Sequence, residues 1–443
     1  MKITSSYAVQ IKKIDFDIMA TVDNYREAVS FCIDVCEKEW ATISQIKGGR
    51  NRRACLEHFI HTTKDNKAKY EEFDKRFNKF PSYLRRDAMT TAIGIVSSYH
   101  SNYTNWEENG KQGNPPQLSM DHNVTPVFYR KNMYLESDNP YECQIKVFVN
   151  NDWVWKTIHL NPTDVKYIQK HKKDIDPCAP VLEKRFGLYF LRFAFVEKRD
   201  LYDTAIENRV ICAVDLGLNN DAVCSIMTAD GTVHARKFIN FPCEKDQLYR
   251  VCNRIKKQQR KHGNKSVKSR WRYATHLNNE LSGKIATAIV EFAELYNADT
   301  IVFEHLDMKQ KKRGKNAQKL HLWRKNGIQE IVMRKAHLKY MHVSRICAWG
   351  TSKLAFDGSG EVTRDPKNHS LATFQSGKQY NCDLSASYNI GARYFIRKLL
   401  NLLPEKEKSQ LLAKVPEVER RTSCTLDTLK KMNSFLKELS SVA

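Results

Sequence analysis

Several features of membrane, secreted and zinc-binding proteins are missing from this sequence. Its 12 cysteines are scattered from Cys32 to Cys424, and no two of them form the C-x-x-C pair typical of zinc knuckles. No apolar run reaches the roughly 18 residues that a membrane-spanning helix needs. The first residues, 1–15, contain no apolar signal-peptide core. We therefore expect reduced cysteines, a cytoplasmic location and no membrane partner.

Acidic residues are few relative to basic ones. The 443 residues include 73 Lys and Arg but 50 Asp and Glu, which gives a formal net charge of +23. Such a charge needs a polyanionic partner, and nucleic acid is a better candidate than a membrane because no membrane segment is predicted. With 41% hydrophobic residues, the chain is long enough for roughly three domains.

Three carboxylates lie where an isolated acid has little structural use. Asp215 lies in the apolar run 211–217, Glu304 ends a short apolar strand, and Asp383 lies near the start of a predicted helix. A buried unpaired carboxylate is costly, although an Asp at a helix start is often only a cap. Together the three suit two Mg²⁺ ions, which prefer oxygen ligands and stabilise both the attacking and the leaving oxygen of a phosphodiester.

The three acids and their neighbours resemble the RuvC motifs of transposon-encoded TnpB nucleases and the related type V CRISPR effectors. The matching segments are, in chain order, Asp215-Leu216-Gly217 with Asn219, then Phe303-Glu304-His305-Leu306, then Asp383, Ser385, Ala386, Asn389 and Ile390. They cover about the last half of the chain. The resemblance implies an RNase H-like nuclease domain in which Asp215, Glu304 and Asp383 are catalytic and hold two Mg²⁺ ions.

The resemblance also implies a multidomain organisation of α+β and α/β type. Alternating apolar residues predict an antiparallel β-barrel, the wedge, which a helical recognition insertion interrupts. An unrelated all-β module is the alternative. The expected domains are 1–20 (first barrel strand), 21–115 (recognition), 116–205 (remainder of the barrel) and 206–443 (RuvC nuclease, with an insert at 348–382).

Two basic segments are candidate nucleic-acid contacts. Residues 250–272 contain very few acids, so we expect this stretch to follow the backbone of an RNA–DNA hybrid; a solvated helix is the alternative. The run after Glu304 is interpreted as a lid or as a segment that orders on binding. The candidate contacts are Arg254, Lys256, Lys257, Arg260, Lys261, Lys265, Lys268, Arg270, Arg272, Lys311, Lys312 and Arg313.

One further pair is a candidate reader of a short DNA motif flanking the target. Tyr83 and Arg86 are three residues apart in a predicted helix and so share a face, which could present an aromatic ring and a guanidinium to a base edge. The alternative places Tyr83 in the core and Arg86 in solvent.

The insert at 348–382 departs from the zinc ribbon that the family carries there. Ala355, Gly358, Thr373 and Ser376 occupy the places of the four cysteines, so we expect no structural zinc. Packing of apolar side chains is expected to hold the insert, namely Leu354, Phe356, Leu371 and Phe374. An irregular site is the alternative, built from Cys347, Asp357, His369 and Cys382.

The sequence and the resemblance together predict a compact RNA-guided DNA endonuclease that cuts both strands in one RuvC site. Its expected partners are a guide RNA and double-stranded target DNA, bound by a monomer or by a homodimer on one RNA, near a prokaryotic nucleoid. A guide-independent, resolvase-type nuclease and a binding-only nucleic-acid regulator are the alternatives.

Overall fold

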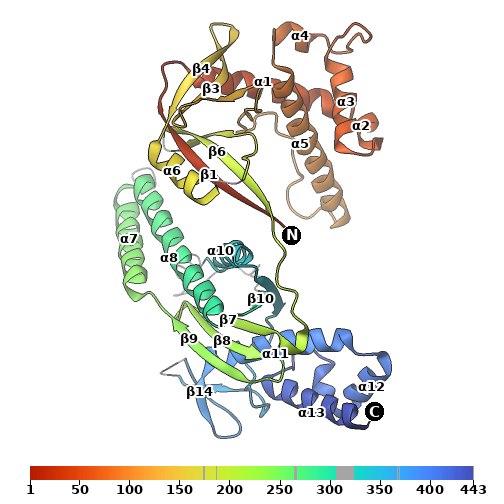
Figure 1. The fold of residues 1–443 in the computed structure, drawn as a ribbon, viewed down its shortest axis with the longest axis vertical. Helices are drawn as coiled ribbons and strands as arrows, with labels where there is room; N and C mark the ends of the chain where they lie inside the picture. Colours follow the sequence, from red (N-terminus) through yellow and green to blue (C-terminus); the bar gives the residue numbers. More distant parts are fainter. Residues whose placement is uncertain are drawn as a thin grey trace. The chain divides into compact units, whose positions relative to one another are not determined.

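The chain divides into two compact units, which are described separately. One comprises residues 2–197, and the other comprises residues 198–443 together with Met1. The computed structural model describes residues 1–172, 175–185, 187–263, 267–305, 324–366, 368 and 370–442 (Figure 1). The prediction of a mixed α and β, multidomain protein is confirmed.

The first unit contains a six-stranded sheet in the order β2-β3-β4-β1-β6-β5. Its strand β1 comes from the start of the chain and pairs antiparallel with β4, with Ile11 beside Leu160. The strands are β1 (Lys2–Lys13), β2 (Tyr134–Glu136), β3 (Glu142–Val149), β4 (Asp152–Leu160), β5 (Val181–Arg185) and β6 (Leu188–Lys198).

This sheet is a half-barrel, whereas a compact barrel was predicted. The segment before β2 connects its two edges, because Val127 bridges Val181 of β5 and Arg130 bridges Tyr134 of β2. These are isolated bridges, so residues 127–129 do not form a regular strand of the sheet. Arg130 directs its side chain to Glu136 and Asp176.

Helices fill the chain between β1 and β2. The first is capped by Asp17, whose carboxylate accepts a hydrogen bond from the Met19 amide at 2.9 Å. The helices of this unit are α1 (Ile18–Lys38), α2 (Trp40–Gln45), α3 (Gly49–Ile60), α4 (Glu72–Arg76), α5 (Ser82–Glu108) and, after β4, α6 (Pro162–Lys172). Helix α6 was not predicted, although Pro162 at its first position is a favourable start.

The second unit contains a five-stranded sheet in the order β11-β10-β7-β8-β9. Strand β8 is antiparallel to both β7 and β9, and β10 is parallel to both β7 and β11. The strands are β7 (Val210–Asp215), β8 (Ala222–Thr228), β9 (Val233–Ile239), β10 (Thr300–His305) and β11 (His342–Cys347).

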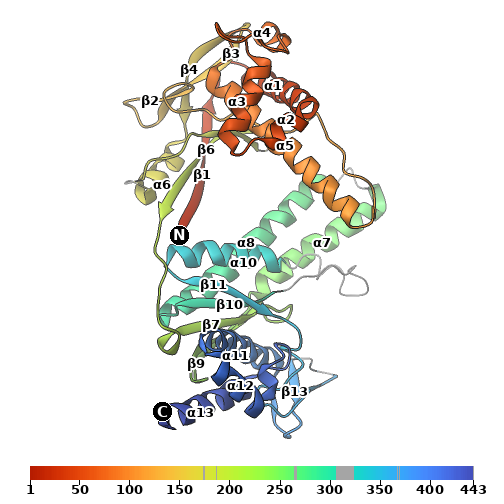
Figure 2. The ribbon, with the colours of Figure 1, turned by 90° about the vertical axis from the view of Figure 1, so that its right-hand side faces the viewer.

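Helices cover both faces of this sheet (Figure 2). Cys212 and Val214 pack with α8 (Lys268–Leu295) and α10 (Lys325–Leu338). Ile211 and Ala213, which point the other way because side chains alternate along a strand, pack with α11 (Cys382–Leu402) and α13 (Leu426–Val442). The two faces therefore belong to two separate apolar cores.

Smaller elements complete the second unit. A three-stranded sheet in the order β12-β13-β14 lies before α11. The remaining elements are α7 (Pro242–His262), α12 (Glu405–Lys414), β12 (Thr363–Arg364), β13 (Leu371–Thr373), β14 (Gln379–Asn381) and the 3₁₀ turns η1 (Ile206–Asn208) and η3 (Pro416–Val418). Within the described ranges, no helix combines the length and the apolar character that a bilayer span requires.

Candidate active site

Strand alternation brings Asp215 and Glu304 to one face of the five-stranded sheet. Asp215 ends β7 and shares the parity of Ile211 and Ala213, which pack against α11. Glu304 shares the parity of Val302, which lies in the same core. The parallel register aligns Phe303 with Val214, so the two acids follow on neighbouring strands. Both carboxylates consequently face α11.

Asp383 is the second residue of α11. The cap of this helix is Asn381, whose side chain accepts a hydrogen bond from the Leu384 amide at 2.9 Å. Asp383 is therefore not needed as the cap, which was the ordinary explanation for an acid at this place. Its carboxylate accepts a hydrogen bond from the Asn220 side chain at 3.2 Å, in the turn between β7 and β8.

The three acids are close enough to affect one another's ionisation. Burial raises the pKa of Asp215 well above its ordinary value, and the charges of Glu304 and then Asp383 raise it further. Arg364 of β12 acts in the opposite direction. The structure thus brings the three predicted acids together in an electrostatically unfavourable group.

Glu304 is 8% exposed and has specific partners. Burial raises its pKa, while the Thr351 hydroxyl, which donates a hydrogen bond to its carboxylate, and the charge of Arg393 lower the pKa. The Gln329 side chain of α10 donates to the Glu304 main-chain oxygen at 3.0 Å. These interactions fix the end of β10.

Two residues of α11, Asn389 and Arg393, hold the main-chain segments around the site by hydrogen bonds. Asn389 donates to the main-chain oxygens of Thr351 (3.0 Å) and Leu354 (2.9 Å) and accepts from the Leu426 amide (3.2 Å). Arg393 is 5% exposed, and burial lowers the pKa of its guanidinium. It donates to four main-chain oxygens, those of Cys347, Trp349, Thr422 and Cys424.

The sequence analysis did not find most of these supporting residues. Asn220, Arg364 and Arg393 carried no signal, because Asn220 and Arg393 bond to residues 29 to 163 positions away and Arg364 acts on Asp215 in a distant strand. Asn389 belonged to the third matching motif, but its bonds to the Thr351 segment could not be read from that motif. Thr351 lies near the start of the insert, and its hydrogen bond to Glu304 also had no local signal.

The donor chemistry of the three acids suits Mg²⁺, since all three offer carboxylate oxygens and their mutual repulsion raises the pKa of Asp215. Within the part of the chain that the structure describes, no three His, Cys, Asp or Glu side chains are arranged so that they could already hold a metal ion. The metal assignment therefore rests on the donor chemistry and the shared face.

The insert is held by hydrogen bonds and packed rings. Asp357 accepts from the Ser359 amide (3.1 Å), the Ser359 hydroxyl (2.7 Å) and the Ser376 hydroxyl (2.7 Å). The Phe356 ring lies 5.0 to 5.5 Å, centroid to centroid, from the rings of Phe374, Tyr380 and Tyr388. These contacts link the insert to α11.

The insert core differs from the predicted one in two of four residues. Phe356 and Phe374 contribute to it, but the buried small residues Ala355, Ala372 and Cys382 take the central places, while Leu354 and Leu371 are only partly buried.

Two cysteines of the alternative metal site differ in exposure. Cys347 is exposed at the end of β11 and Cys382 is buried at the start of α11. Gly358, one of the positions of the family's cysteines, has φ of +76°, and a Cβ there would lie 2.5 Å from an Asp427 carboxylate oxygen. His369 lies outside the described residues.

The main basic stretch forms part of an antiparallel helix pair. Helices α7 and α8 pack through Leu248, Cys252, Ile255 and Ala274 (Figure 1).

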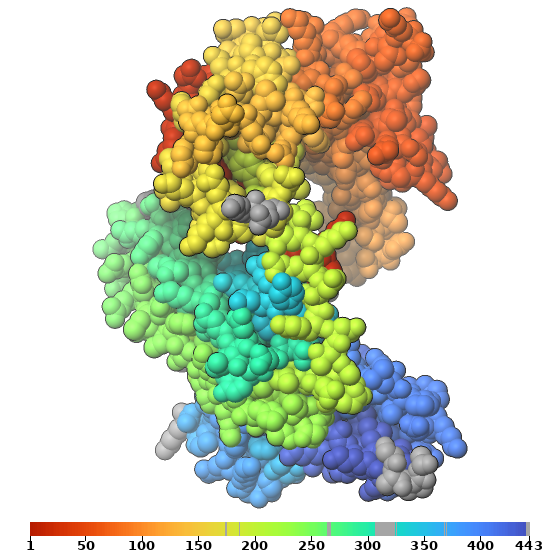
Figure 3. All heavy atoms as spheres, in the orientation of Figure 1, coloured from red at the N-terminus to blue at the C-terminus, as the bar shows by residue number. Residues whose placement is uncertain are grey.

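Helix α7 lies at the surface, in green in Figure 3. A hollow of about 430 Å³ on this helix is lined by Tyr249, Arg250 and Arg254 among others. The exposed predicted contacts are Arg254, Lys256, Lys257, Arg260, Lys261, Lys268, Arg270 and Arg272. Lys265, Lys311, Lys312 and Arg313 lie outside the described residues.

The two candidate flanking-motif residues lie together on α5. The Arg86 guanidinium carbon is 5.8 Å from the centroid of the Tyr83 ring, which lies 5.6 Å from that of Tyr129. Tyr83 is 38% exposed, so its side chain does not lie in the core, where the alternative interpretation placed it. Its role in recognition stays a prediction.

Comparison with known proteins finds a similar fold. The Cas12f1–sgRNA–target DNA complex matches at 15% identity with a TM-score of 0.50, covering 84% of this chain and 81% of that chain. A CRISPR-Cas12f ternary complex (12% identity, TM-score 0.31, 83% and 80% covered) and C2c1 of Alicyclobacillus acidoterrestris with single-guide RNA (9%, 0.43, 83% and 67%) are more distant.

Residues 5–149 match the Aq_aa04 family. No curated protein sequence matches the chain. The resemblance to compact type V effectors is therefore confirmed for the fold, whereas the relation to TnpB stays a prediction.

The contacts of Arg393 predict a large effect on stability. Arg393→Met should lower the free energy of unfolding by about 3 kcal/mol or more, because it leaves buried main-chain oxygens without donors. Urea unfolding measures this change. Arg397→Met is the matched control on the same helix, since Arg397 also bonds to β11 but is more exposed. Equal losses in the two variants would contradict the supporting role of Arg393.

Proposed function

We propose that this chain is an RNA-guided DNA endonuclease with a single RuvC-type, RNase H-like active site formed by Asp215, Glu304 and Asp383. The observation that carries the proposal is that two neighbouring parallel strands and the start of α11 direct these acids to one face of the sheet. The likeness of the fold to Cas12f1 supports it. The second unit is then the nuclease domain, and the helices between β1 and β2 are the recognition insertion.

The three carboxylates would hold two Mg²⁺ ions. When bound, the ions supply charge stabilisation at the attacking and the leaving oxygen of the phosphodiester. The chain's own residues keep the acids in place: Thr351 orients the Glu304 carboxylate and Asn220 orients that of Asp383. Arg364, which already lowers the pKa of Asp215, would contact the phosphate being cut.

A guide RNA and double-stranded target DNA are the proposed partners. Base pairing supplies sequence specificity, and the protein reads the shape and the backbone of the hybrid. The exposed basic face of α7 and α8 suits this role because phosphate contacts need cations without base specificity. Tyr83 and Arg86 would read a flanking motif on the target.

The acidic site is tested with the protein and the RNA that copurifies with it. Sequencing this RNA identifies the guide, and a DNA that contains its complement with randomised flanks serves as substrate. We expect Asp215→Asn, Glu304→Gln and Asp383→Asn each to reduce Mg²⁺-dependent cleavage by about 10³-fold or more while target binding changes little.

Asp230→Asn is the control, since Asp230 is an exposed acid in the turn after β8. It should cut at the wild-type rate. Near wild-type cleavage by any of the three site variants would show that the acids are wrongly assigned. Cleavage without bound RNA would indicate a guide-independent nuclease instead.

The basic face of α7 predicts a steep salt dependence of binding without metal. Six phosphate contacts give a slope of log Kobs against log salt of about −5. Neutralising Lys256, Lys257, Arg260 and Lys261 to Gln should flatten the slope by about 3, measured by fluorescence anisotropy with the target hybrid. The matched control neutralises four exposed lysines elsewhere in this unit, namely Lys398, Lys406, Lys430 and Lys437. An equal effect of both sets would place the hybrid elsewhere.

The contacts of the insert predict that it needs no zinc. Tetrahedral zinc needs four N or S ligands, and the knuckle positions hold Ala355, Gly358, Thr373 and Ser376. Elemental analysis should find well below one zinc per chain, and protein treated with a chelator should regain full cleavage on addition of Mg²⁺ alone. A stoichiometric zinc whose removal unfolds the insert would contradict this prediction.

A further inference from the structure

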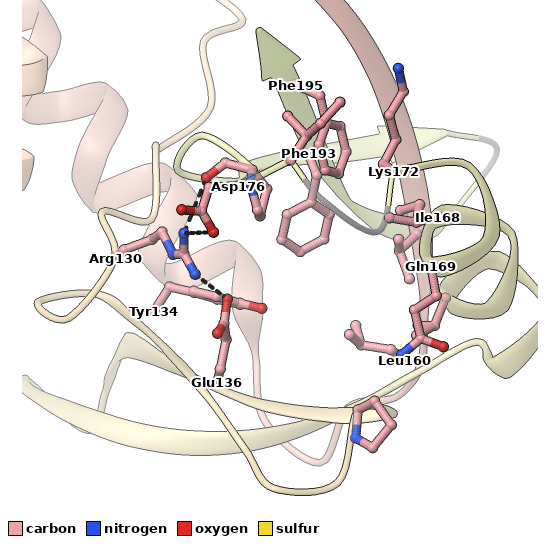
Figure 4. Close-up of a pocket in the computed structure, with 15 residues that line it drawn as sticks. Arg130, Tyr134, Glu136, Leu160, Ile168, Gln169, Lys172, Asp176, Phe193 and Phe195 are labelled. Carbon is pink, nitrogen blue, oxygen red and sulfur yellow. Dashed lines mark hydrogen bonds and ion pairs between the residues drawn. The ribbon is translucent and has the colours of Figure 1, made fainter. Parts of the chain in front are cut away.

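A hollow of about 660 Å³ lies between α6 and the half-barrel sheet (Figure 4). Its volume is within the range of roughly 300 to 1,000 Å³ that small-molecule pockets occupy. The apolar wall includes Val9 of β1, Leu160 of β4, Ile168 of α6 and Phe193 of β6. None of these residues belongs to the acidic site, and the sequence analysis assigned none of them a function.

A guanidinium and two carboxylates form the polar side of the hollow. Arg130 Nη2 donates to Glu136, and Arg130 Nη1 lies 3.9 Å from an Asp176 oxygen and donates to the Pro177 main-chain oxygen at 3.4 Å. Figure 4 shows these groups opposite Ile168 and Gln169. The hollow therefore offers hydrogen-bond donors and acceptors side by side.

The cations of this site are already neutralised. Arg130 lies between Glu136 and Asp176, and the buried Lys172 pairs with Glu197, with its side chain directed away from the hollow (Figure 4). A phosphate would therefore find no uncompensated positive charge inside, and it would meet two carboxylates. This charge balance excludes an anionic occupant and is compatible with a neutral one that offers hydrogen-bond donors to the carboxylates.

An aromatic surface completes the site. The Phe193 ring projects into the hollow in Figure 4 and meets the Tyr134 ring edge to face, with 5.8 Å between centroids. Flat heteroaromatic rings stack on such surfaces, and a base stacked on an aromatic side chain contributes about 1–3 kcal/mol.

We propose that this hollow receives an unpaired guanine base of RNA, an inference that rests on the proposed nucleic-acid-binding function. Guanine combines N1–H and N2–H donors, which suit the Glu136 carboxylate, with the O6 and N7 acceptors, which suit Arg130. Adenine lacks the O6 acceptor, and the pyrimidines are smaller. The sugar and phosphates would remain outside, attracted by the net charge of +23.

The test uses labelled RNA heptamers of sequence UUUXUUU, in which X is guanine, adenine or an abasic site. Binding to the full chain, freed of copurified RNA, is measured by fluorescence anisotropy in EDTA, so that no cleavage occurs. We expect the guanine heptamer to bind about ten-fold more tightly than the abasic one, which corresponds to one stacked and hydrogen-bonded base. Adenine should fall between them.

Three variants localise the effect. Ile168→Trp fills the hollow and should remove the difference between guanine and abasic heptamers, whereas Lys166→Trp adds the same ring to the exposed side of α6 and should preserve it. Glu136→Gln, an exposed position that leaves the apolar wall intact, should bring the preference for guanine over adenine to unity.

Equal binding of the guanine, adenine and abasic heptamers to the wild-type protein would overturn the proposal. A guanine preference that survives both Ile168→Trp and Glu136→Gln would overturn it as well. Because these measurements need neither metal nor guide nor cleavage, their failure is distinguishable from failure of the acidic site. A chain that cuts DNA but binds all heptamers equally would retain the proposed function without this pocket.

Discussion

Repulsion among carboxylates on one sheet face is the constraint on which the second unit depends. Asp215 and Glu304 follow aligned residues of two parallel strands, and Asp383 approaches from α11. Desolvation and like charge both oppose ionisation of Asp215. The surrounding residues offset part of this cost through neutral donors, Thr351 and Asn220, and more distant cations. Protonation of Asp215 would relieve this repulsion, and so would binding of the proposed Mg²⁺ ions.

The rest of the unit supports that face through α11. One side of this helix packs on the sheet, while Asn389 and Arg393 hold the chain segments that lead into the insert and into α13. The insert itself depends on Asp357, two serines and a cluster of rings. These hydrogen bonds and ring contacts link the parts of the insert to one another, and Thr351 connects the insert directly to Glu304.

The basic and aromatic features of the two units suggest a division of tasks. The exposed cations of α7 and α8 suit a phosphate backbone, because they carry charge with few acids beside them. The hollow beside α6 has the opposite character, since its cations are paired and its walls are apolar. Backbone attraction and base recognition would then belong to different surfaces of the same chain.

The local sequence pattern determined several of the strands and helices and the expected class of partner. Apolar runs predicted β7 and β10, a helix was predicted at Tyr83 and Arg86 where α5 lies, and the charge imbalance predicted a polyanionic partner. Each of these predictions depends on neighbouring residues or on composition alone. The three acids were found by their unusual places within such patterns. Missing cysteines predicted the absence of a zinc ribbon, which stays untested.

Only the tertiary structure decided the features that depend on distant residues. The half-barrel closes through isolated bridges at Val127 and Arg130, which no local alternation encodes. Helix α6 forms the wall of the hollow, although its short sequence has a weak pattern. Arg393 reaches oxygens 29 to 46 residues away, and Asn220 meets Asp383 across 163 residues. A sequence fixes which faces are apolar, but the partners across those faces are set by how strands and helices pack.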